Sequence, residues 1–499
     1  MQKALSDDAR YAALSARDPR FDGVFFVGVK TTGIYCRPIC PARTPSRGRC
    51  EFFATAARAE AAGFRACFRC RPELAPGSAP PEVGTDETGG GRRGRSAPVD
   101  AVDSLVAAAA RRIAEGALNE RSIADLAGEL GVSERHLRRA TEARLGVSPV
   151  ELAQSQRLAL AKQLLQDTSL PLAQIAFAAG FGSVRRFNAV FSARMGASPS
   201  SLRPRAETGP GIVLRLDYRP PYDWARLLAF LQDRAIPGVE VVTGDTYRRI
   251  VHLDGKLGEL EVRPASGRAA LELAIAPALL PVLMPLRARV RRMFDLDAHP
   301  DAIAAALGRD RALAAMVRAR PGLRVPGAID PFEAAVRALL GQQVSVAAAT
   351  TLAGRFAAQL GHEVGSGELR YRFPTPREVV AAGPERIVKL GMPMARANAI
   401  HGLASAIVGG NVQLDGPCEL DAIVASLVAL RGIGPWTAHY LAMRALHLPD
   451  AFPAADLGIQ KALERAGARA AEERAEAWRP FRSYAVMHLW TQLSERTAR

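Results

Sequence analysis

Four cysteines near the N-terminus have the spacing of a metal site. Cys36 and Cys40 are separated by three residues, Cys67 and Cys70 by two, and 26 residues lie between the pairs. Two such pairs can place four thiolates around one tetrahedral Zn²⁺, so we predict one zinc ion at a four-cysteine site. The alternative is four unrelated thiols or a redox Cys-x-x-Cys. A four-cysteine site can be structural, or one thiolate can attack an electrophilic carbon, and the spacing does not select the reactive sulfur.

Arginines are dense around these cysteines, which suits phosphate contact, although a solvated basic face has the same composition. They are Arg37, Arg43, Arg47, Arg49, Arg65, Arg69 and Arg71. The whole chain of 499 residues carries 66 Lys and Arg against 50 Asp and Glu, a net charge of +16. This excess favours a polyanionic partner, with nucleic acid first. Charge alone does not separate a repressor from a repair enzyme or a ribosomal factor.

Two runs around the cysteines, Val29–Cys40 and Ala62–Cys70, closely resemble the N-terminal domain of Ada-type methylation-response proteins. The resemblance implies that Cys36 takes a methyl group irreversibly from a methylphosphotriester in the DNA backbone. It also implies that the loss of one thiolate charge raises the affinity for DNA. We assign Arg37, the next residue, to DNA contact. The family's other acceptor motif, Pro-Cys-His-Arg, does not occur in this sequence, so repair of O6-alkylguanine is not expected.

Two helix-turn-helix patterns follow in tandem. In the first, Gly131 suits the turn and Ser133 the N-cap of the second helix, and Gly180 and Ser183 do the same in the second pattern. One such pattern could be an ordinary helical hairpin, but two separated by a long helix resemble the DNA-binding domain of AraC/XylS-type regulators. The resemblance implies that the second helix of each unit reads the major groove. The basic residues that we assign to DNA contact there are Arg135, Arg138, Arg139, Arg185 and Arg186.

A Gly-x-Gly turn in the C-terminal region can present backbone N–H groups to a phosphate. Gly432 and Gly434 permit a tight turn before a helix, although such a turn can be an ordinary connection. Asp456 follows about twenty residues later, and a lone Asp before a helix is more often an N-cap than a catalyst. The combination resembles the helix-hairpin-helix DNA glycosylase superfamily. Further runs narrow the resemblance to AlkA-type 3-methyladenine glycosylases: Leu340–Gln343, Phe373–Pro376, Leu390–Met392 and Arg482–Ala485.

The resemblance to AlkA-type glycosylases implies roles for several residues. Asp456 matches the catalytic Asp, which stabilises an oxocarbenium-like state and orients or deprotonates water. Trp436 stands where bifunctional relatives carry a nucleophilic Lys, so we expect a monofunctional enzyme that leaves an abasic site. Trp436, Tyr440 and Trp490 match an aromatic pocket for a flipped base, in which cationic bases are favoured. Packing in the core is the alternative for the tryptophans.

Residues of the hairpin and of one further loop are assigned to DNA contact. In the hairpin they are Gly432, Gly434 and Thr437. The family's intercalating wedge is an apolar residue in the loop after Gly341, whereas this chain has Gln342 and Gln343 there. We assign both glutamines to DNA contact, and the wedge itself stays unidentified.

These motifs predict a multidomain, mainly α-helical chain with α+β parts. Short alternating runs such as Ile212–Leu216 predict antiparallel strands, with a helix near Trp224–Arg234, before helical periodicity returns. The expected parts are a small zinc domain with the four cysteines (1–75), a flexible linker rich in Pro, Gly and Ser (76–100), a domain with two helix-turn-helix units (101–205), an AlkA-type mixed α/β domain (211–300) and a helix-hairpin-helix glycosylase domain (301–499).

Composition excludes some classes of protein. Hydrophobic residues at 48% and charged residues at 23% match globular usage and exclude a mostly disordered chain. No stretch approaches ~18 uninterrupted apolar residues, and the first residues lack an apolar signal core. We therefore expect a cytoplasmic, DNA-associated protein that does not enter a membrane. The expected partners are alkylated and promoter double-stranded DNA, with RNA polymerase as a further candidate.

Three functions fit these observations. The first is a fused alkylation-response protein that senses methylphosphotriesters and excises alkylated purines such as 3-methyladenine. The second is a transcription regulator whose glycosylase-like half is only a DNA-binding module. The third is a repair enzyme whose front half only delivers it to damage. The sequence does not give the promoter, the ranking of alkylated bases, the oligomeric state or any coupling between sensing and excision.

Overall fold

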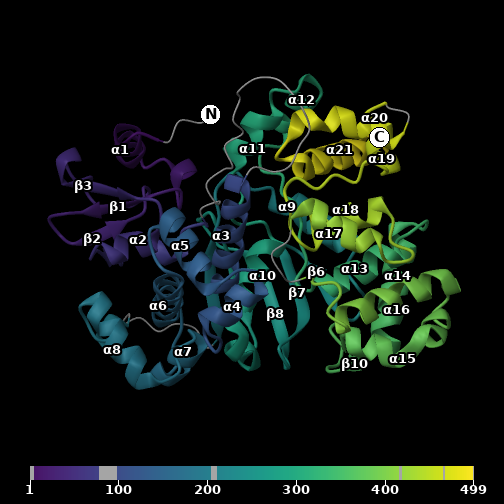
Figure 1. The fold of residues 1–499 in the computed structure, drawn as a ribbon, viewed down its shortest axis with the longest axis horizontal. Helices are drawn as coiled ribbons and strands as arrows, with labels where there is room; N and C mark the ends of the chain where they lie inside the picture. The colour runs from purple at the N-terminus through teal and green to yellow at the C-terminus, as the bar shows by residue number, and fades with distance from the viewer. Residues whose placement is uncertain (1–4, 78–97, 204–210, 415–418, 465–466, 498–499) are drawn as a thin grey trace. The chain divides into compact units, whose positions relative to one another are not determined.

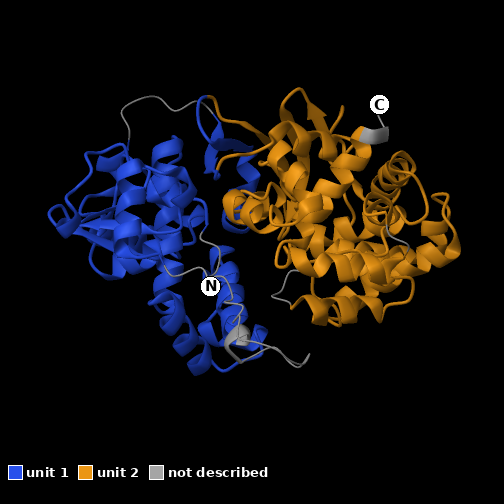
Figure 2. Cartoon of the chain, turned by 90° about the horizontal axis from the view of Figure 1, so that it is seen from above, with its two compact units in different colours: residues 1–219, 267–288 blue, residues 220–266, 289–499 orange. Residues whose placement is uncertain are grey.

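The computed structural model describes residues 5–77, 98–203, 211–414, 419–464 and 467–497. The chain divides into two compact units, shown in Figure 2. Unit 1 comprises residues 1–219 and 267–288, and unit 2 comprises residues 220–266 and 289–499. This division crosses the predicted 211–300 domain, so the domain limits stay predictions. Most of the predicted linker (residues 78–97) lies outside the described residues.

The N-terminal part of unit 1 is a small sheet with strand order β3-β1-β2-β4. Its strands are β1 (Phe26–Val29), β2 (Ile34–Cys36), β3 (Cys50–Phe53) and β4 (Arg65–Ala66), and its helices are α1 (Asp7–Ala16) and α2 (Ala56–Ala61). β1 is antiparallel to β2 and β3, whereas β2 and β4 are parallel neighbours. The ends of β2 and β4 therefore lie side by side. Each leads directly into one cysteine pair, and this brings the two pairs together.

Six helices form the next part of unit 1 (Figure 1). They are α3 (Pro98–Ala114), α4 (Ile123–Glu129), α5 (Glu134–Leu145), α6 (Pro149–Asp167), α7 (Leu172–Ala178) and α8 (Val184–Met195). Ser133 and Ser183 cap α5 and α8 through their side chains, as expected from the sequence. Gly131 and Gly180 have φ of 69° and 83°, which glycine adopts without strain. The two helix-turn-helix units joined by the long α6 are confirmed.

Two strands and a helix complete unit 1. β5 (Ile212–Asp217) pairs antiparallel with β9 (Ala270–Ile275). The side chains of Leu214 and Leu216 on β5 are buried while Val213 and Arg215 are less so, in the alternation that the sequence predicted. The first residues of α10 (Leu283–Met293) follow β9 in this unit.

Unit 2 begins with a helix and three strands. α9 (Trp224–Gln232) is followed by β6 (Glu240–Thr243), β7 (Thr246–Leu253) and β8 (Lys256–Pro264). β7 is antiparallel to both β6 and β8. Gly244 and Gly255 adopt positive φ in the two tight turns that connect these strands. The predicted mixture of short antiparallel strands and one helix is confirmed.

The remainder of unit 2 is helical apart from the short strands β10 (His362–Glu363) and β11 (Tyr371–Arg372). Its helices are α11 (Pro300–Leu307), α12 (Arg311–Ala319), α13 (Pro331–Leu340), α14 (Val346–Leu360), α15 (Pro376–Val388), α16 (Met394–Val408), α17 (Leu420–Val428), α18 (Pro435–Arg444), α19 (Leu457–Ala462), α20 (Ala468–Ala475) and α21 (Arg482–Thr497). α18 contributes Ala438 and Leu441 to one apolar core and Ala442 and Met443 to another. Packing against both cores holds in place the helix that carries Trp436 and Tyr440.

The architecture confirms the predicted fold class: a multidomain, mainly helical chain with α+β parts. Across the described ranges, none of the helices combines the length and the apolar character that crossing a bilayer would require.

Candidate functional site

The four predicted cysteines converge in unit 1. Their Sγ atoms all lie within 4.8 Å of one another. Cys40, Cys67 and Cys70 are buried, whereas Cys36, at the end of β2, is partly exposed. Cys36 is thus the least buried residue of the four.

The chemistry of this cluster fits a zinc ion. Hydrogen bonds among the thiols raise the pKa of Cys36 and lower that of Cys67, because protons lost by one sulfur are held by another. Four thiols this close cannot all ionise without a cation among them. A donor set of four sulfurs in one compact group is the set that tetrahedral Zn²⁺ prefers. The four cysteines would be the ligands.

The arginines around the cluster fall into two groups. The side chains of the first group are exposed or, for Arg47, partly exposed: Arg43, Arg47, Arg49, Arg65 and Arg69. Arg37 is only 2% exposed, and its guanidinium forms ion pairs with Asp22 and Asp217. Arg71 pairs with Glu73 and Asp167. The sequence assigned Arg37 to DNA contact, but the structure places its side chain inside unit 1.

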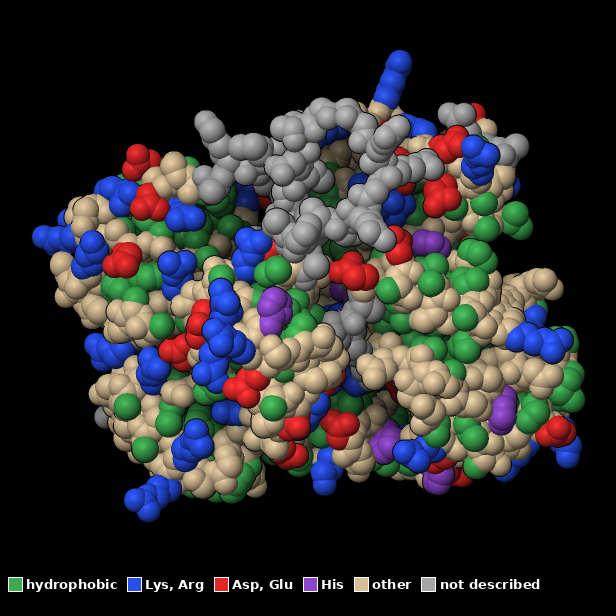
Figure 3. Space-filling view, in the orientation of Figure 1, with side chains coloured by type: hydrophobic (Ala, Val, Ile, Leu, Met, Phe, Trp, Pro, Cys, Tyr) green, Lys and Arg blue, Asp and Glu red, His purple; other side chains and the backbone are tan. Residues whose placement is uncertain are grey.

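The predicted DNA-reading arginines lie on the two expected helices. Arg135, Arg138 and Arg139 are exposed on α5, and Arg185 and Arg186 lie at the start of α8. Arg138 pairs with Glu134 one turn earlier, at 2.8 Å. On the face of unit 1 shown in Figure 3, Lys and Arg side chains recur among scattered Asp and Glu.

In unit 2, Asp456 receives three N–H groups. It is the N-cap of α19, where its Oδ1 accepts from the backbone N–H of Ile459 at 2.9 Å. The indole N–H of Trp490 donates to Oδ1 at 3.1 Å, and that of Trp436 donates to Oδ2 at 3.0 Å. Asp456 is therefore an N-cap whose carboxylate also accepts from two indoles. Both carboxylate oxygens are oriented by side chains from two other helices.

The three predicted pocket residues form an aromatic cluster beside this carboxylate. Trp436 and Tyr440 are stacked, with ring centroids 5.4 Å apart and planes inclined by 22°. Trp490 lies 6.2 Å from Tyr440. Because both indoles bond to Asp456, the aromatic rings and the carboxylate form one site. A planar base held against these rings would bring its sugar toward a negative oxygen.

Sequence reasoning missed the arginines that surround Tyr440. Arg444, only 7% exposed, donates to the Tyr440 hydroxyl at 3.3 Å. Burial alone would raise the pKa of Tyr440. The net shift of this pKa is nevertheless downward, because the guanidinium groups of Arg444, Arg234 and Arg337 lie nearby. Burial also lowers the pKa of Arg444 to about 10. The one signal in the sequence is the i, i+4 spacing of Tyr440 and Arg444 on a helix.

The hairpin residues are held in place by their neighbours. Gly432 has φ of 89°, and a Cβ there would lie 2.5 Å from the Ala399 side chain, so the turn requires glycine. Thr437 is buried and accepts a hydrogen bond from Gln342 Nε2 at 3.0 Å, and Gln342 also donates to the Gly432 carbonyl. Gln343, in contrast, is exposed at a φ of 58°. Of the two glutamines, the structure presents only Gln343 freely to solvent.

Comparison with known families accounts for most of the chain. Residues 9–73 match the metal binding domain of Ada, and residues 126–205 match a helix-turn-helix domain. Residues 213–330 match the AlkA N-terminal domain, and residues 336–482 match the HhH-GPD superfamily of base excision DNA repair proteins.

Individual proteins are similar in sequence to the same parts of this chain. The probable bifunctional transcriptional activator/DNA repair enzyme AlkA of Mycobacterium tuberculosis is 39% identical over 97% of this chain and 96% of its own length. The chain belongs to this AlkA family. The DNA-3-methyladenine glycosylase 2 of Escherichia coli is 38% identical over 55% of this chain and 95% of its own length. The bifunctional Ada of the same organism is 53% identical over 15% of this chain and 22% of its own length.

The matched domains and membership in the AlkA family confirm the three predicted resemblances and the combination of a repair half with an Ada-like regulatory part. The match to the metal binding domain of Ada, together with the compact four-sulfur cluster, also confirms the predicted zinc site. DNA is the partner common to the matched helix-turn-helix and base excision repair domains.

Proposed function

We propose that this AlkA-family chain is a fused alkylation-response protein. Its C-terminal half hydrolyses the N-glycosidic bond of alkylated purines such as 3-methyladenine in DNA. Its N-terminal domain takes a methyl group from a DNA methylphosphotriester onto Cys36, which activates sequence-specific DNA binding and transcription. The observation that carries the excision activity is the Asp456 carboxylate, oriented by Trp436 and Trp490 at the edge of the aromatic cluster.

Excision follows from the charges that develop during bond cleavage. An alkylated purine is already cationic and leaves readily, so positive charge accumulates on the sugar. The ionised Asp456 carboxylate stabilises that charge, and it orients or deprotonates the water that completes the hydrolysis. Stacking on Trp436, Tyr440 and Trp490 holds the base outside the duplex. Gln343 and the hairpin at Gly432 contact the strand around the flipped nucleotide.

The reaction ends at an abasic site. A bifunctional glycosylase needs an amine to form a Schiff base with the sugar. By the resemblance, Trp436 stands where bifunctional glycosylases carry the nucleophilic Lys, and its indole N–H donates to Asp456. Because an indole nitrogen is not nucleophilic, strand cleavage does not accompany base release.

The methyl transfer is a single displacement. The Cys36 thiolate attacks the methyl carbon, the bond from that carbon to the phosphotriester oxygen breaks, and the phosphodiester recovers its negative charge. Cys36 becomes a thioether and cannot react again, so each chain transfers once. Zn²⁺, when bound by the four cysteines, keeps their sulfurs ionised at neutral pH. Arg43, Arg49, Arg65 and Arg69 supply cations for the DNA backbone.

Promoter recognition belongs to the two helix-turn-helix units. Arg135, Arg138, Arg139, Arg185 and Arg186 project from α5 and α8 toward base edges and phosphates. Activation of transcription further implies contact with RNA polymerase.

The excision activity is tested on duplex DNA treated with a methylating agent. Wild-type protein is expected to release 3-methyladenine, and Asp456→Asn to release it at least about 100-fold more slowly, because the charge is lost while the shape is kept. Asp421→Asn, an exposed carboxylate on α17, is the matched control and should behave as wild type. Equal release by wild type and Asp456→Asn contradicts the assignment. Binding without any release supports the alternative of a DNA-binding module.

A further inference from the structure

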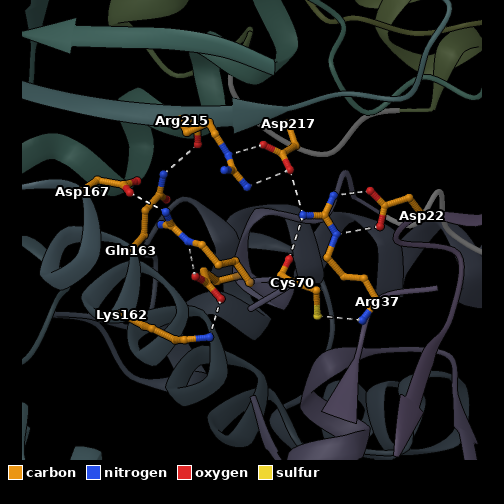
Figure 4. A network of polar contacts seen from close by, with 10 residues as sticks. Asp22, Arg37, Cys70, Lys162, Gln163, Asp167, Arg215 and Asp217 are labelled. Atoms are coloured by element: carbon orange, nitrogen blue, oxygen red, sulfur yellow. Dashed lines mark hydrogen bonds and ion pairs between the residues drawn. The ribbon is translucent and has the colours of Figure 1, made fainter. Parts of the chain in front are cut away.

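A buried group of charges links the cysteine site to β5. We define the Arg37 cluster as Asp22, Arg37, Asp217 and Arg219. Arg37 Nε donates to Asp22 Oδ1 at 2.8 Å, and its Nη1 donates to Asp217 Oδ2 at 2.8 Å (Figure 4). The side chains of Asp22 and Asp217 are 5% and 11% exposed. Buried ion pairs of this kind are favourable only while the charged partners keep this one arrangement.

One end of the cluster is attached to the metal-binding residues. Arg37 follows Cys36 directly, and its backbone N–H donates to Cys70 Sγ at 3.3 Å. Its Nη1 donates to the Cys70 carbonyl at 3.2 Å. A change in charge or position at Cys36 therefore acts on Arg37 through both the chain and the sulfur cluster.

The other end is attached to the segment that leads out of unit 1. Asp217 is the last residue of β5, and its Oδ1 accepts from Arg215 Nε at 2.7 Å. Arg219 donates to the Asp22 carbonyl at 2.8 Å and to the Gly77 carbonyl at 2.7 Å. β5 lies within the residues that match the AlkA N-terminal domain, and the chain enters unit 2 at Pro220.

A second set of contacts joins the same site to α6, the helix between the two helix-turn-helix units. Lys162 Nζ donates to the Cys67 carbonyl and to Glu73 Oε2, both at 2.8 Å. Gln163 Nε2 donates to the Arg215 carbonyl of β5 at 2.8 Å. The cysteine site, α6 and β5 thus share one continuous network inside unit 1.

Methylation of Cys36 changes the charge that this network experiences. Four thiolates around Zn²⁺ carry a formal charge of −2, and conversion of one to a thioether leaves −1. In the Arg37 cluster, the carboxylates of Asp22 and Asp217 bond to the guanidinium of Arg37, which itself contacts Cys70. Charges in such a buried region interact strongly because water screens them little. Loss of one negative charge reduces repulsion of both carboxylates and lets Arg37 hold them more tightly.

We propose that the Arg37 cluster couples the methylation state of Cys36 to β5, and so to the AlkA-type half of the chain. In the unmethylated protein β5 is held more loosely, and methyl transfer tightens it through the bond from Arg37 to Asp217. Arg37 acts as a positioning residue between the sensor and the repair half. This inference rests on the proposed methyl transfer to Cys36.

The test is amide hydrogen exchange of the full, zinc-loaded chain before and after methylation by DNA that carries methylphosphotriesters. Peptides that cover β5 and residues 19–23 are expected to exchange at least about fivefold more slowly after methylation, within the usual range of coupling between two sites. In Asp217→Asn this slowing should disappear. The same slowing in Asp217→Asn, or none in wild type, overturns the proposal.

Two controls make the result specific. Glu259→Gln removes an exposed carboxylate of β8 and should keep the wild-type response. If Asp217→Asn does not retain zinc, Asp217→Glu takes its place in the test. This variant keeps the negative charge but moves it by one methylene. A response reduced by at least half in that variant supports the coupling, and a wild-type response overturns it.

Mass spectrometry of the same samples separates the two proposals. If no methyl group appears on Cys36, the proposed methyl transfer fails. If the methyl group appears but β5 exchanges as before, only the coupling fails.

Discussion

Asp456 in unit 2 and Arg37, the residue after Cys36 in unit 1, are held by different kinds of partner. Asp456 is held by donors without net charge, the indole N–H groups of Trp436 and Trp490 and the backbone of Ile459. Next to Cys36, Arg37 is fixed by full charges in the protein interior. A carboxylate that must stabilise a cation is best oriented by neutral donors, which leave its charge available. A sensor that changes its own charge needs charged neighbours that respond.

The difference predicts that methyl uptake can be lost while base release continues. Cys36→Ser should abolish methyl uptake, because a serine hydroxyl is not ionised at neutral pH, while base release stays within about twofold of wild type. Mass spectrometry of the peptide with residue 36 measures the uptake. Cys50→Ser, a buried thiol outside the cluster, is the control and should still accept one methyl group at Cys36. Methyl transfer to Cys67 or Cys70 in wild type would contradict the assignment.

A smaller effect is expected when one neutral donor is removed from Asp456. Trp490→Phe keeps an aromatic ring but loses the N–H donor, so the single-turnover rate of base release should fall about tenfold, the equivalent of one hydrogen bond. Substrate binding should change less, since the stacking surface remains. Trp478→Phe, which removes an indole bonded to Asp310 in the core, serves as a control for stability. A rate equal to wild type in Trp490→Phe would show that this donor does not orient the carboxylate.

The smallest effect concerns how the stability of unit 2 depends on pH. Burial lowers the pKa of His488, two residues before Trp490 on α21, to about 4. The unfolded chain binds this proton near pH ~6.5, so the stability of unit 2 is complete above that pH and declines as the pH falls toward ~4. The loss at pH ~4 should reach about 3 kcal/mol and should be much smaller in His488→Leu.

Tryptophan fluorescence during urea unfolding measures this effect in one unit alone. All four tryptophans, Trp224, Trp436, Trp478 and Trp490, belong to unit 2. His136→Leu, an exposed histidine on α5 of unit 1, should leave the pH profile of the fluorescence transition unchanged. An identical acid response of His488→Leu and wild type would assign the loss of stability to other groups.

The sequence predicted the parts that depend on local spacing. Four cysteines in two pairs and the serine caps before α5 and α8 carry their signal in short runs. The assignment of Trp436, Tyr440 and Trp490 rests instead on the resemblance to AlkA-type glycosylases. The burial of Arg37 could not be predicted in this way, because its partners Asp22 and Asp217 lie 15 and 180 residues away. An arginine among exposed arginines looks like part of a phosphate-binding surface until its tertiary partners are known.

The same limit applies to unit 2. Gln342 and Gln343 are neighbours of one type, yet Gln342 bonds to Thr437 and the hairpin, whereas Gln343 is exposed at positive φ. Only the packing of α13 and α18 separates their roles. The arginines around Tyr440 come from α13, from α18 and from the segment that follows α9, and no sequence window contains them together.

One time course tests the central claim that a single-use sensor and a catalyst share this chain. Wild-type protein is mixed with excess DNA that carries both methylphosphotriesters and 3-methyladenine, and methyl groups per chain and released base are measured together. We expect methyl uptake to stop at one group per chain, on Cys36, while base release continues through many turnovers. Base release that stops with the methylation of Cys36, or methyl uptake that continues beyond one group per chain, would contradict the account.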